Sequence, residues 1–293
     1  MKVALTGASG LIGGRLVAAL EARGDEVVLF SRSPSRGVQW DPVAEPAPAE
    51  VLSGVEAVVH LAGEPVAQRW NDDVKRRIAD SRALGTAHLI DGLRIADPRP
   101  RVLVSTSASG YYGDRGADSI DETSAPGDDF LAGVCVEWER AASIAGTELG
   151  MRVVYVRNGV VLDAGGGALK TMLPPFKAGV GGPVAGGRQY MPWIAADDDV
   201  GIYLAALDSE DWSGAVNASA PEPVTNAEFS RALGRVLHRP AVMPVPGFAL
   251  RLRFGEMATI VTASQRMVPA RALELGYRFR FGDLDAALTA ALT

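Results

Sequence analysis

The sequence predicts an α/β protein in which a doubly wound, parallel sheet carries helices on both of its faces. Short apolar runs of strand length alternate with longer amphipathic segments over residues 1–163, and this alternation is typical of parallel βαβ units. The first apolar run leads directly into a turn with glycines at positions 7, 10 and 13. Since 47% of the 293 residues are hydrophobic, the chain can also bury a large core.

The expected elements follow one another in a regular order. Apolar runs predict strands at residues 1–6, 26–30, 55–61, 101–105 and 151–157. The helical spacing of apolar residues predicts helices at residues 11–23, 72–95 and 130–149, and the Pro- and Ala-rich residues 42–49 predict a loop. After residue 163 glycine-rich loops become frequent, with a strand expected at 189–194 and helices at 197–207, 225–237 and after Asp283.

The turn after the first strand is a candidate phosphate-binding loop. Gly7 allows a sharp turn, Gly10 allows a ligand to approach the backbone closely, and Gly13 allows the helix to pack against the strand. The unpaired N–H groups at the following helix start carry the positive end of the helix dipole, so they can bind a pyrophosphate. The sequence therefore predicts a Rossmann-type dinucleotide site, whose expected residues are Gly7, Ser9, Gly10, Leu11, Ile12 and Gly13.

The end of the second strand indicates which dinucleotide is bound. An Asp or Glu at this point hydrogen-bonds both hydroxyls of the adenosine ribose and repels a 2′-phosphate. This chain has Ser31-Arg32-Ser33 there, with no carboxylate. Because Arg32 can form a charge-assisted fork to a phosphate and the serines can add donors, we expect NADP(H) rather than NAD(H).

The composition argues against several kinds of partner and site. The formal net charge is −6 and no dense cluster of Lys and Arg occurs, so neither nucleic acid nor a membrane is expected as a partner. A single cysteine, Cys135, forms no intrachain disulfide, and the three histidines are too widely separated to suggest a metal site. No apolar run approaches the ~18 residues of a membrane span, and the first residues do not resemble a signal peptide. We expect a cytoplasmic protein that acts on a small molecule.

Several motifs resemble those of the short-chain dehydrogenase/reductase superfamily in its extended, epimerase-like form. The matching pieces are Thr6–Gly13, His60–Gly63, and Ser105–Ala108 followed by Tyr112-Gly113. Further pieces resemble the narrower "epimerase family" subgroup, sometimes described as SulA-like cell-division inhibitors, which has a C-terminal domain of unknown function. These pieces are Arg69-Trp70, Ser81-Arg82, Trp138-Glu139, Arg157–Leu162, Gly165–Ala168, Pro192–Ile194, Gly255–Met257 and Phe279–Phe281.

The resemblance implies a cofactor site and a domain organisation. In the family, the segment that His60–Gly63 matches lies against the adenine and ribose, and the serine-rich strand end lies beside the nicotinamide. The NADP(H)-site residues implied in this way are Ser31, Arg32, Leu61, Ala62, Gly63, Arg77, Arg82, Ser105 and Val160. We expect an NADP(H)-binding domain at residues 1–163 that receives some later segments, substrate-lobe segments at 164–244 and a small helical unit at 245–293.

The chain departs from the family at the catalytic residues. Most members use a Tyr as general acid/base, with a Lys four residues later on the same helix and a Ser on the strand end. If Glu139 is the Glu that often follows this Lys, the Lys position holds Cys135 and the Tyr position holds Leu131. No other alignment with the family supplies the Tyr and Lys, since residues 113–154 contain no Tyr and residues 76–169 contain no Lys.

The remaining candidates for catalysis are Ser107 and Tyr111. Ser107 is either the hydroxyl that orients a substrate oxygen or a cap of the strand end, and Tyr111 is the nearest substitute for the missing acid. We expect the Cys135 thiol to be buried and inert, and residues 179–187 and Trp193 to wall the substrate cleft. Aromatic residues expected to pack rather than to act are Trp40, Trp70, Tyr112 and Trp138.

Two functions follow from these residues. The first is an NADP(H)-dependent oxidoreductase for a small carbonyl or hydroxyl substrate, in which a bound carbonyl accepts hydride, Ser107 orients its oxygen, and Tyr111 or a water supplies the proton. The second, which the missing Tyr and Lys motivate, is a non-catalytic NADP(H)-binding regulator or redox sensor, in which a partner reads closure of the C-terminal unit. A link to cell division rests on the family's name alone.

Overall fold

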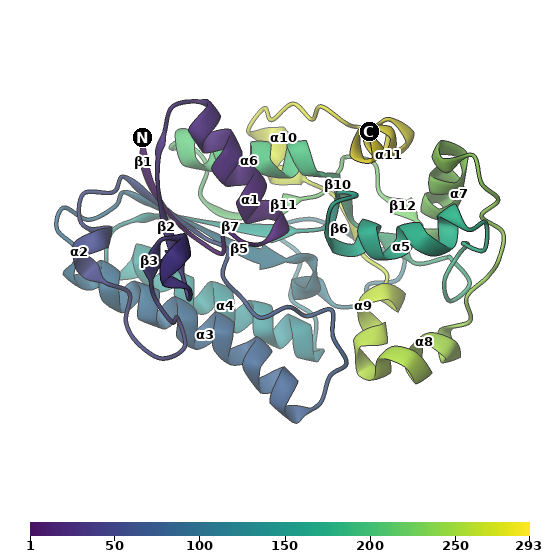
Figure 1. Cartoon of the computed structure of the whole chain (residues 1–293), viewed down its shortest axis with the longest axis horizontal. Coiled ribbons are helices and arrows are strands. Elements are labelled where there is room, and N and C mark those ends of the chain that lie inside the picture. Colours follow the sequence, from purple (N-terminus) through teal and green to yellow (C-terminus); the bar gives the residue numbers. More distant parts are fainter.

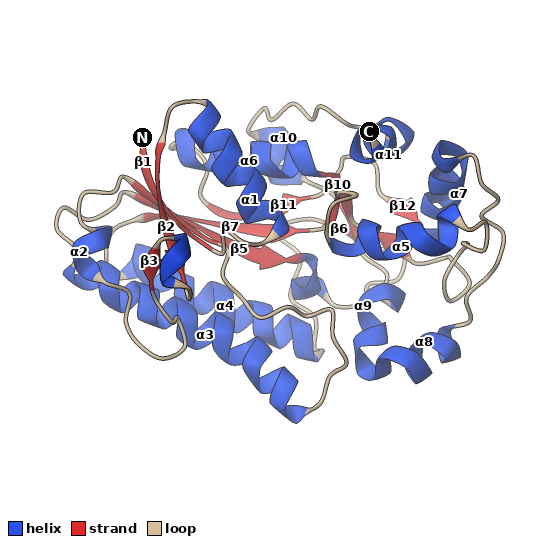
Figure 2. Ribbon diagram, in the orientation of Figure 1, coloured by secondary structure: helices blue, strands red, loops and turns tan.

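A computed structural model describes residues 1–293 and has a seven-stranded parallel sheet at its centre (Figures 1 and 2). Its strands, in spatial order, are β11 (Gly214–Ala218), β7 (Arg152–Asn158), β5 (Val102–Ala108), β4 (Ala57–His60), β1 (Lys2–Thr6), β2 (Glu26–Ser31) and β3 (Val38–Gln39). All neighbouring strands are parallel. This arrangement confirms the predicted doubly wound sheet, and it shows that β11, from the later part of the chain, completes one edge.

Helices cover both faces of the sheet, as Figure 2 shows. α3 (Asp72–Ile95) and α4 (Phe130–Thr147) lie on one face, whereas α1 (Leu11–Ala22) and α6 (Ala196–Asp208) lie on the other; α2 (Ala49–Leu52) is a single turn. Side chains of β1 alternate between the faces, because Val3 and Leu5 join the core under α1 and α6 while Ala4 joins the core under α3 and α4. Burial on both faces explains the unbroken apolar runs that predict these strands.

Helix boundaries lie close to the predicted ones because side chains cap the helices. At the start of α3, Asn71 accepts a hydrogen bond from the backbone N–H of Val74, and the bounds of this helix match the prediction. Asp129 caps α4 in the same way, and Thr225 and Glu228 form a reciprocal capping box at α7 (Asn226–Leu237).

A second, smaller lobe is built from later segments (Figure 1). Its elements are α5 (Gly167–Lys177), α7 and α11 (Leu284–Leu292), with strand pairs β8 (Val160–Leu162)/β10 (Trp193–Ala195) and β9 (Tyr190–Met191)/β12 (Val224–Thr225). Pro192 interrupts the strand expected at 189–194, because proline has no N–H to donate. Trp193 is 1% exposed at the centre of this lobe's core, so the expectation that it walls the cleft is wrong.

Residues 245–293 run along several parts of the molecule. α8 (Gly247–Phe254) and α9 (Thr259–Thr262) are joined to the start of α3 by an ion pair between Glu256 and Lys75 at 2.6 Å. β13 (Arg266–Met267) pairs with β6 (Ser119–Ile120), α10 (Ala270–Glu274) packs on β11, and α11 fills the second lobe. Short 3₁₀ turns are Pro34–Arg36, Ser109–Tyr112 and Gly255–Ala258. None of the helices combines the length and the apolar character needed to cross a membrane.

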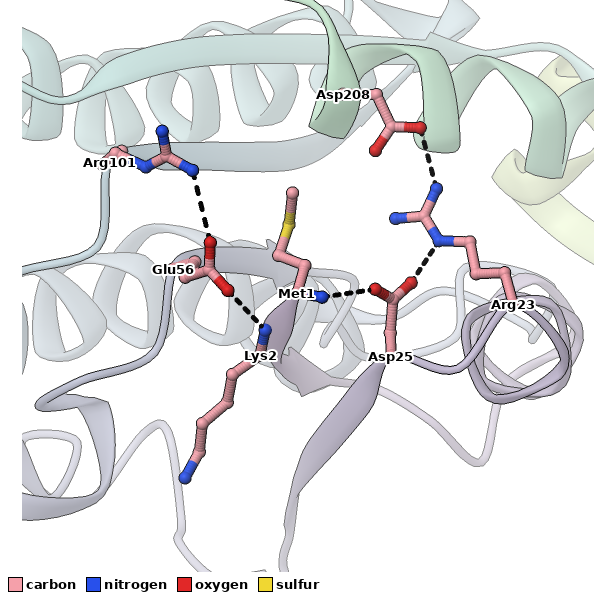
Figure 3. Close-up of polar contacts among 7 residues, drawn as sticks. All are labelled: Met1, Lys2, Arg23, Asp25, Glu56, Arg101 and Asp208. Carbon is pink, nitrogen blue, oxygen red and sulfur yellow. Dashed lines mark hydrogen bonds and ion pairs between the residues drawn. The ribbon is translucent and has the colours of Figure 1, made fainter.

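Polar contacts hold the amino-terminal edge of the sheet together, as Figure 3 shows. They join Met1 to Asp25, Lys2 to Glu56, Glu56 to Arg101, and Arg23 to both Asp25 and Asp208. Apart from Asp208, which ends α6, these residues lie at or near the starts of β1, β2, β4 and β5, so they fix the strands at the edge opposite their carboxyl ends. The loops at the carboxyl edge are left to form a binding site.

Candidate cofactor-binding and catalytic site

A cavity of about 360 Å³ opens at the carboxyl ends of the central strands, between the sheet and the start of α5. Its lining residues are Gly7, Gly10, Leu11, Ile12, Gly13, Leu61, Thr106, Gly159, Val160, Val161, Gly167 and Ala168. The structure thus brings the predicted glycine turn together with Leu61 and Val160. This is the edge at which doubly wound sheets bind their ligands.

A larger depression of about 560 Å³ lies on the second lobe. Basic side chains at the end of α7 line it, and they are Arg231, Arg235, His238 and Arg239. Cations at the carboxyl end of a helix are stabilised by the helix dipole, and Arg235 is already paired with Asp285 at 2.8 Å. We therefore place the candidate site at the sheet edge.

The glycine turn has the shape that a phosphate-binding loop requires. Gly7 has a φ of +77°, and a Cβ there would lie 2.7 Å from the carbonyl carbon of Leu61. A Cβ at Gly13 would lie 2.9 Å from Cα of Ala8 and would clash with the carbonyl oxygen of Gly7. At Gly10, by contrast, a Cβ would meet only that carbonyl oxygen, at 3.3 Å. The packing of the fold therefore excludes a side chain less strictly at Gly10, where the absence of a side chain keeps the cavity open to a ligand.

The first turn of α1 offers unpaired donors to this cavity. Gly10 is the N-cap residue, so no side chain caps the turn, and the turn contains no acidic residue. The N–H groups of Leu11, Ile12 and Gly13 therefore have no partner within the helix. Ser9 is exposed beside them. These features fit the pyrophosphate of a dinucleotide.

The end of β2 supplies hydroxyl groups and a cation. Ser31 is half-buried, and its Oγ accepts a hydrogen bond from the N–H of Ser33 at 3.1 Å. Arg32 is exposed, and no side chain of the chain pairs with its guanidinium. Because no carboxylate stands at this strand end, the residues fit an adenosine ribose that carries a 2′-phosphate.

The segment after β4 is pinned to β1 by Thr6. The Thr6 Oγ1 accepts hydrogen bonds from the N–H groups of Leu61 at 3.1 Å and Ala62 at 3.2 Å. The same oxygen lies 2.8 Å from Nδ1 of His60. Burial, together with the charge of Arg82, lowers the pKa of His60 to about 4, so this imidazole is neutral at pH 7. The backbone of residues 61–62 is therefore fixed beside the cavity before any ligand binds.

Several predicted residues do not line the cavity, so their contact with a cofactor or substrate stays a prediction. They are Ser9, Ser31, Arg32, Ala62, Gly63, Arg77, Arg82 and Ser105, together with the catalytic candidates Ser107 and Tyr111. Arg77 is exposed and pairs with Glu64 at 3.6 Å. Arg82 donates to the carbonyl oxygen of Glu64 at 3.0 Å, and a Cβ at Gly63 would lie 3.2 Å from its Cζ. Ser105 is buried within β5, with its hydroxyl directed at the main chain.

Ser107 belongs to a buried polar network. It is 2% exposed, and its Oγ donates to Oε1 of Glu139 on α4 at 2.7 Å. Glu139 also accepts two hydrogen bonds of 2.8 Å from the guanidinium of Arg157, which in turn donates to Oη of Tyr112 at 2.9 Å. Burial raises the pKa of Tyr112, so this phenol keeps its proton. The single proton of Ser107 is thus committed to Glu139, and its hydroxyl can only accept a hydrogen bond from a substrate.

Tyr111 lies against the same arginine. Cζ of Arg157 is 3.5 Å from the centroid of the Tyr111 ring, and the ring meets Tyr112 edge-on at 5.2 Å between centroids. The cation–π contact and the edge-on packing fix the plane of the phenol ring. Tyr112 is fully buried, which confirms its expected packing role. The buried Trp40, Trp70 and Trp138 confirm theirs.

The positions that hold Tyr and Lys in most of the superfamily carry no proton relay here. Leu131 is half-buried and Cys135 is buried on α4. Burial raises the pKa of the Cys135 thiol to about 12, although the charge of Arg82 opposes the shift. The thiol therefore stays protonated at neutral pH, in line with the expectation that it is inert.

Five cavity residues were missed by the sequence interpretation, and they are Thr106, Gly159, Val161, Gly167 and Ala168. Four of them belong to the Arg157–Leu162 and Gly165–Ala168 motifs, so the signal was present but was assigned to Val160 alone. The glycine-rich residues 179–187 are not among the lining residues. They pack on residues 240–245 instead, with a bridge between Val184 and Val245.

Family models and full-length relatives match the chain. The model of the NAD dependent epimerase/dehydratase family matches residues 3–218, and that of a domain of unknown function, DUF1731, matches residues 245–291. A chloroplastic epimerase family protein SDR39U1 homolog of Arabidopsis thaliana is 41% identical and covers 100% of this chain and 87% of its own length. The human epimerase family protein SDR39U1 is 38% identical and covers 98% of both chains.

Solved structures extend the match to three dimensions. A crystal structure of the human SDR39U1 protein (isoform 2) with NADPH has a TM-score of 0.92 and 36% identity, with 100% of both chains covered. A nucleoside-diphosphate sugar epimerase from Corynebacterium glutamicum has a TM-score of 0.80 and 37% identity, and covers 100% of this chain and 58% of its own. A UDP-glucuronic acid 4-epimerase from Bacillus cereus, with 16% identity and a TM-score of 0.80, shares the fold. The chain belongs to the NAD dependent epimerase/dehydratase family of the extended short-chain dehydrogenase/reductases, and it carries a match to DUF1731 after the part that the family model covers.

Proposed function

We propose that the chain binds NADP(H) at the sheet edge and acts as an oxidoreductase on a small carbonyl or hydroxyl substrate. The proposal depends on two features that lie on the same edge of the sheet. One is a glycine turn with unpaired N–H donors, and the other is Arg32 at the end of β2, where no carboxylate stands. The human relative, 36% identical over the whole length, was crystallised with NADPH, which supports the same cofactor here.

Different elements of this chain would hold different parts of the cofactor. The first turn of α1 would bind the pyrophosphate through its N–H groups. Ser31 and Arg32 would bind the 2′-phosphate, and Leu61 and Ala62 would lie beside the adenosine. When bound, the nicotinamide cofactor supplies or accepts the hydride.

Ser107 and Tyr111 are the polar groups that we propose for the substrate end. Because the Ser107 proton is donated to Glu139 at 2.7 Å, Ser107 suits a substrate hydroxyl that donates to it. A carbonyl oxygen would require the Ser107 hydroxyl to turn away from Glu139. Tyr111 or a water would then move the proton. Without the Tyr–Lys pair, we expect turnover to be slower by ~10²-fold or more.

A specific observation favours a second function, a non-catalytic NADP(H)-binding regulator or redox sensor. The two positions on α4 that carry the proton relay in most of the superfamily hold a leucine and a thiol whose pKa is raised to about 12. The Glu256–Lys75 pair also couples the C-terminal segment to α3. A cofactor that shifts α3 would therefore be sensed by α8 and α9, where a partner could bind.

A calorimetric titration of the purified protein with NADPH and, separately, with NADH tests the cofactor assignment. We expect a clear preference for NADPH, which Arg32→Ala should remove by weakening NADPH binding about 10- to 100-fold and leaving NADH unchanged. Arg36→Ala, at an exposed arginine in the next turn, is the matched control. Equal binding of both nucleotides by the unaltered protein would contradict the assignment of Arg32.

A second measurement separates the two functions. NADPH oxidation is followed with a panel of aldehydes and ketones, and NADP⁺ reduction with a panel of alcohols. Substrate-dependent turnover that Ser107→Ala or Tyr111→Phe lowers supports the oxidoreductase and its proposed residues. A rise in melting temperature with NADPH but no turnover on either panel supports the regulator.

A further inference from the structure

Two adjacent hydroxyl groups at the end of β5 face opposite sides of the sheet. Ser107 faces α4, where it donates to Glu139. Thr106, one residue earlier, faces the other side and lines the cavity that contains the glycine turn. The two hydroxyls therefore have different partners, although they are neighbours in the sequence. Thr106 has no role in the function proposed above.

Asn158 determines which way the Thr106 hydroxyl is polarised. The Nδ2 group of Asn158, at the end of β7, donates to Oγ1 of Thr106 at 2.7 Å and to Oη of Tyr203 at 2.9 Å. A hydroxyl that accepts a strong hydrogen bond has its own proton left to donate. The chain offers this proton two acceptors. The carbonyl oxygen of Ser107 lies at 3.3 Å, beyond the usual range for O–H···O bonds, and the hydroxyl of Tyr203, which also interacts with Thr106, already accepts from Asn158. A better acceptor on a ligand in the cavity can therefore compete for the Thr106 proton.

The network behind Thr106 is buried and holds Asn158 in place. Tyr203, on α6, is fully buried, and so is Asp199 one turn earlier on the same helix. Neither carboxyl oxygen of Asp199 nor Oδ1 of Asn158 has a hydrogen-bond partner. Because both protons of the Asn158 amide are used on Thr106 and Tyr203, the orientation of the Thr106 hydroxyl is set before a ligand arrives.

The strand order places Thr106 opposite the half of the dinucleotide that carries the nicotinamide. From β2 the order runs through β1 and β4 to β5. Arg32 follows β2 and the glycine turn follows β1, so a dinucleotide lies with its adenosine over β2 and its pyrophosphate over β1. Its other half then extends toward β4 and β5, where Thr106 lies.

We propose that Thr106, polarised by Asn158, donates a hydrogen bond to the carboxamide oxygen of the nicotinamide ring and so positions the ring in the cavity. The inference rests on the proposed NADP(H) binding. It assigns Thr106 and Asn158 as positioning residues, separate from the Ser107–Glu139–Arg157 network on the other face of the sheet. The amide oxygen is a good acceptor, and Thr106 offers the donor that this acceptor needs.

Calorimetric titration with two ligands tests the proposal. NADPH carries the nicotinamide ring, whereas 2′-phospho-ADP-ribose lacks it and retains the remainder. Thr106→Val, which keeps the shape and removes the donor, should weaken NADPH binding about five- to tenfold and leave 2′-phospho-ADP-ribose within about twofold. Thr106→Ser should restore NADPH binding. Thr147→Val, at an exposed threonine near the end of α4, is the control for the substitution itself.

Asn158→Asp provides an independent test if Thr106→Val does not fold. The introduced carboxylate accepts hydrogen bonds, so it would draw the protons of Thr106 and Tyr203 toward itself. A lone pair of the Thr106 hydroxyl oxygen, in place of its proton, would then face the cavity. We expect the same selective loss of NADPH affinity. Unchanged NADPH affinity in both variants, or an equal loss for the two ligands, would overturn the proposal. Failure of the unaltered protein to bind either ligand would instead contradict the NADP(H) site itself.

Discussion

The two ends of the cleft are built in different ways. At the β1–β2 end the ligand-facing groups are backbone N–H groups, glycines and one exposed arginine, none of which depends on a distant partner. At the β5–β7 end many of the polar groups are buried side chains that bind one another, as Ser107, Glu139 and Arg157 do. The first end is specified by a few consecutive residues, whereas the second is specified by pairs that are far apart in the sequence. Substitutions should therefore damage the two ends differently.

The largest effect is expected where the network end loses one of its charges. Glu139→Gln leaves the buried guanidinium of Arg157 without its counter-ion, since Arg157 is only 5% exposed in its side chain. Removing one partner of a buried pair costs about 3–5 kcal/mol, so chemical denaturation should show a loss of this size. Glu137→Gln, on the same helix, breaks an exposed pair with Arg140 and should cost less than about 0.5 kcal/mol. Similar losses for both variants would mean that the network does not stabilise this end.

A second effect, smaller and dependent on pH, concerns Asp199, which is buried on α6 one turn before Tyr203, on the opposite face of the sheet. Burial, with a smaller contribution from Asp198, raises the pKa of Asp199 to about 8. The folded state thus retains a proton that the unfolded chain releases near pH 4, so this residue lowers stability as pH rises from about 4 to 8. Asp199→Asn removes this loss. The free energy of unfolding of the variant, relative to that of the unaltered protein, should therefore increase by on the order of 3 kcal/mol between pH 5 and 8.

Urea denaturation at several pH values measures this difference. Asp197→Asn, a neighbour whose side chain is 44% exposed, should leave the pH dependence of the unfolding free energy in place. Parallel stability curves for Asp199→Asn and the unaltered protein would show that Asp199 is not buried as a neutral acid.

The smallest loss of stability is expected at the glycine end, where the effect on binding is larger. Gly13→Ala places a Cβ against the carbonyl oxygen of Gly7 and 2.9 Å from Cα of Ala8. Crowding of this kind costs about 1–3 kcal/mol, and the displaced turn should bind NADPH much more weakly. Gly14→Ala is the matched control, because a Cβ there would make only an ordinary contact with the carbonyl oxygen of Ala8 at 3.6 Å. It should raise helix stability by about 0.5–1 kcal/mol and retain binding. Loss of binding in both variants would show that α1 tolerates no side chain on this face.

The difference between the locally specified β1–β2 end and the β5–β7 end, which depends on distant pairs, also decides how much of the site could be predicted from the sequence. The glycine turn, the strand end at Ser31-Arg32 and the helix that starts after Asn71 are local patterns, and the structure has them at the expected residues. The network end contains three successive small hydroxyl residues, Ser105 to Ser107, with identical local signals. Alternation along a strand indicates that the middle one faces away from the other two. Which face opens to the cavity depends on the packing of α4 and α6, and no local pattern reports it.

Long-range packing also explains the expectations that were wrong. The expectation that Trp193 and residues 179–187 wall the cleft rests on the crevice at the strand ends, where ligands bind in this architecture. In the structure Trp193 completes the core of the second lobe, and residues 179–187 pack on residues 240–245. Both partners come from parts of the chain that carry no motif, so the sequence offered no reason to pair them.

The path of residues 245–293 has a consequence for how the chain acquires its structure. Ala272 lies in the same core as Val3, and Leu288 fills the core around Trp193. During synthesis the amino-terminal strands leave the ribosome long before these residues exist. The nascent chain therefore exposes an incompletely packed core until residues 245–293 emerge, a period in which contacts of such large sequence separation slow folding and favour aggregation. We expect both cores to close only after these residues have been synthesised.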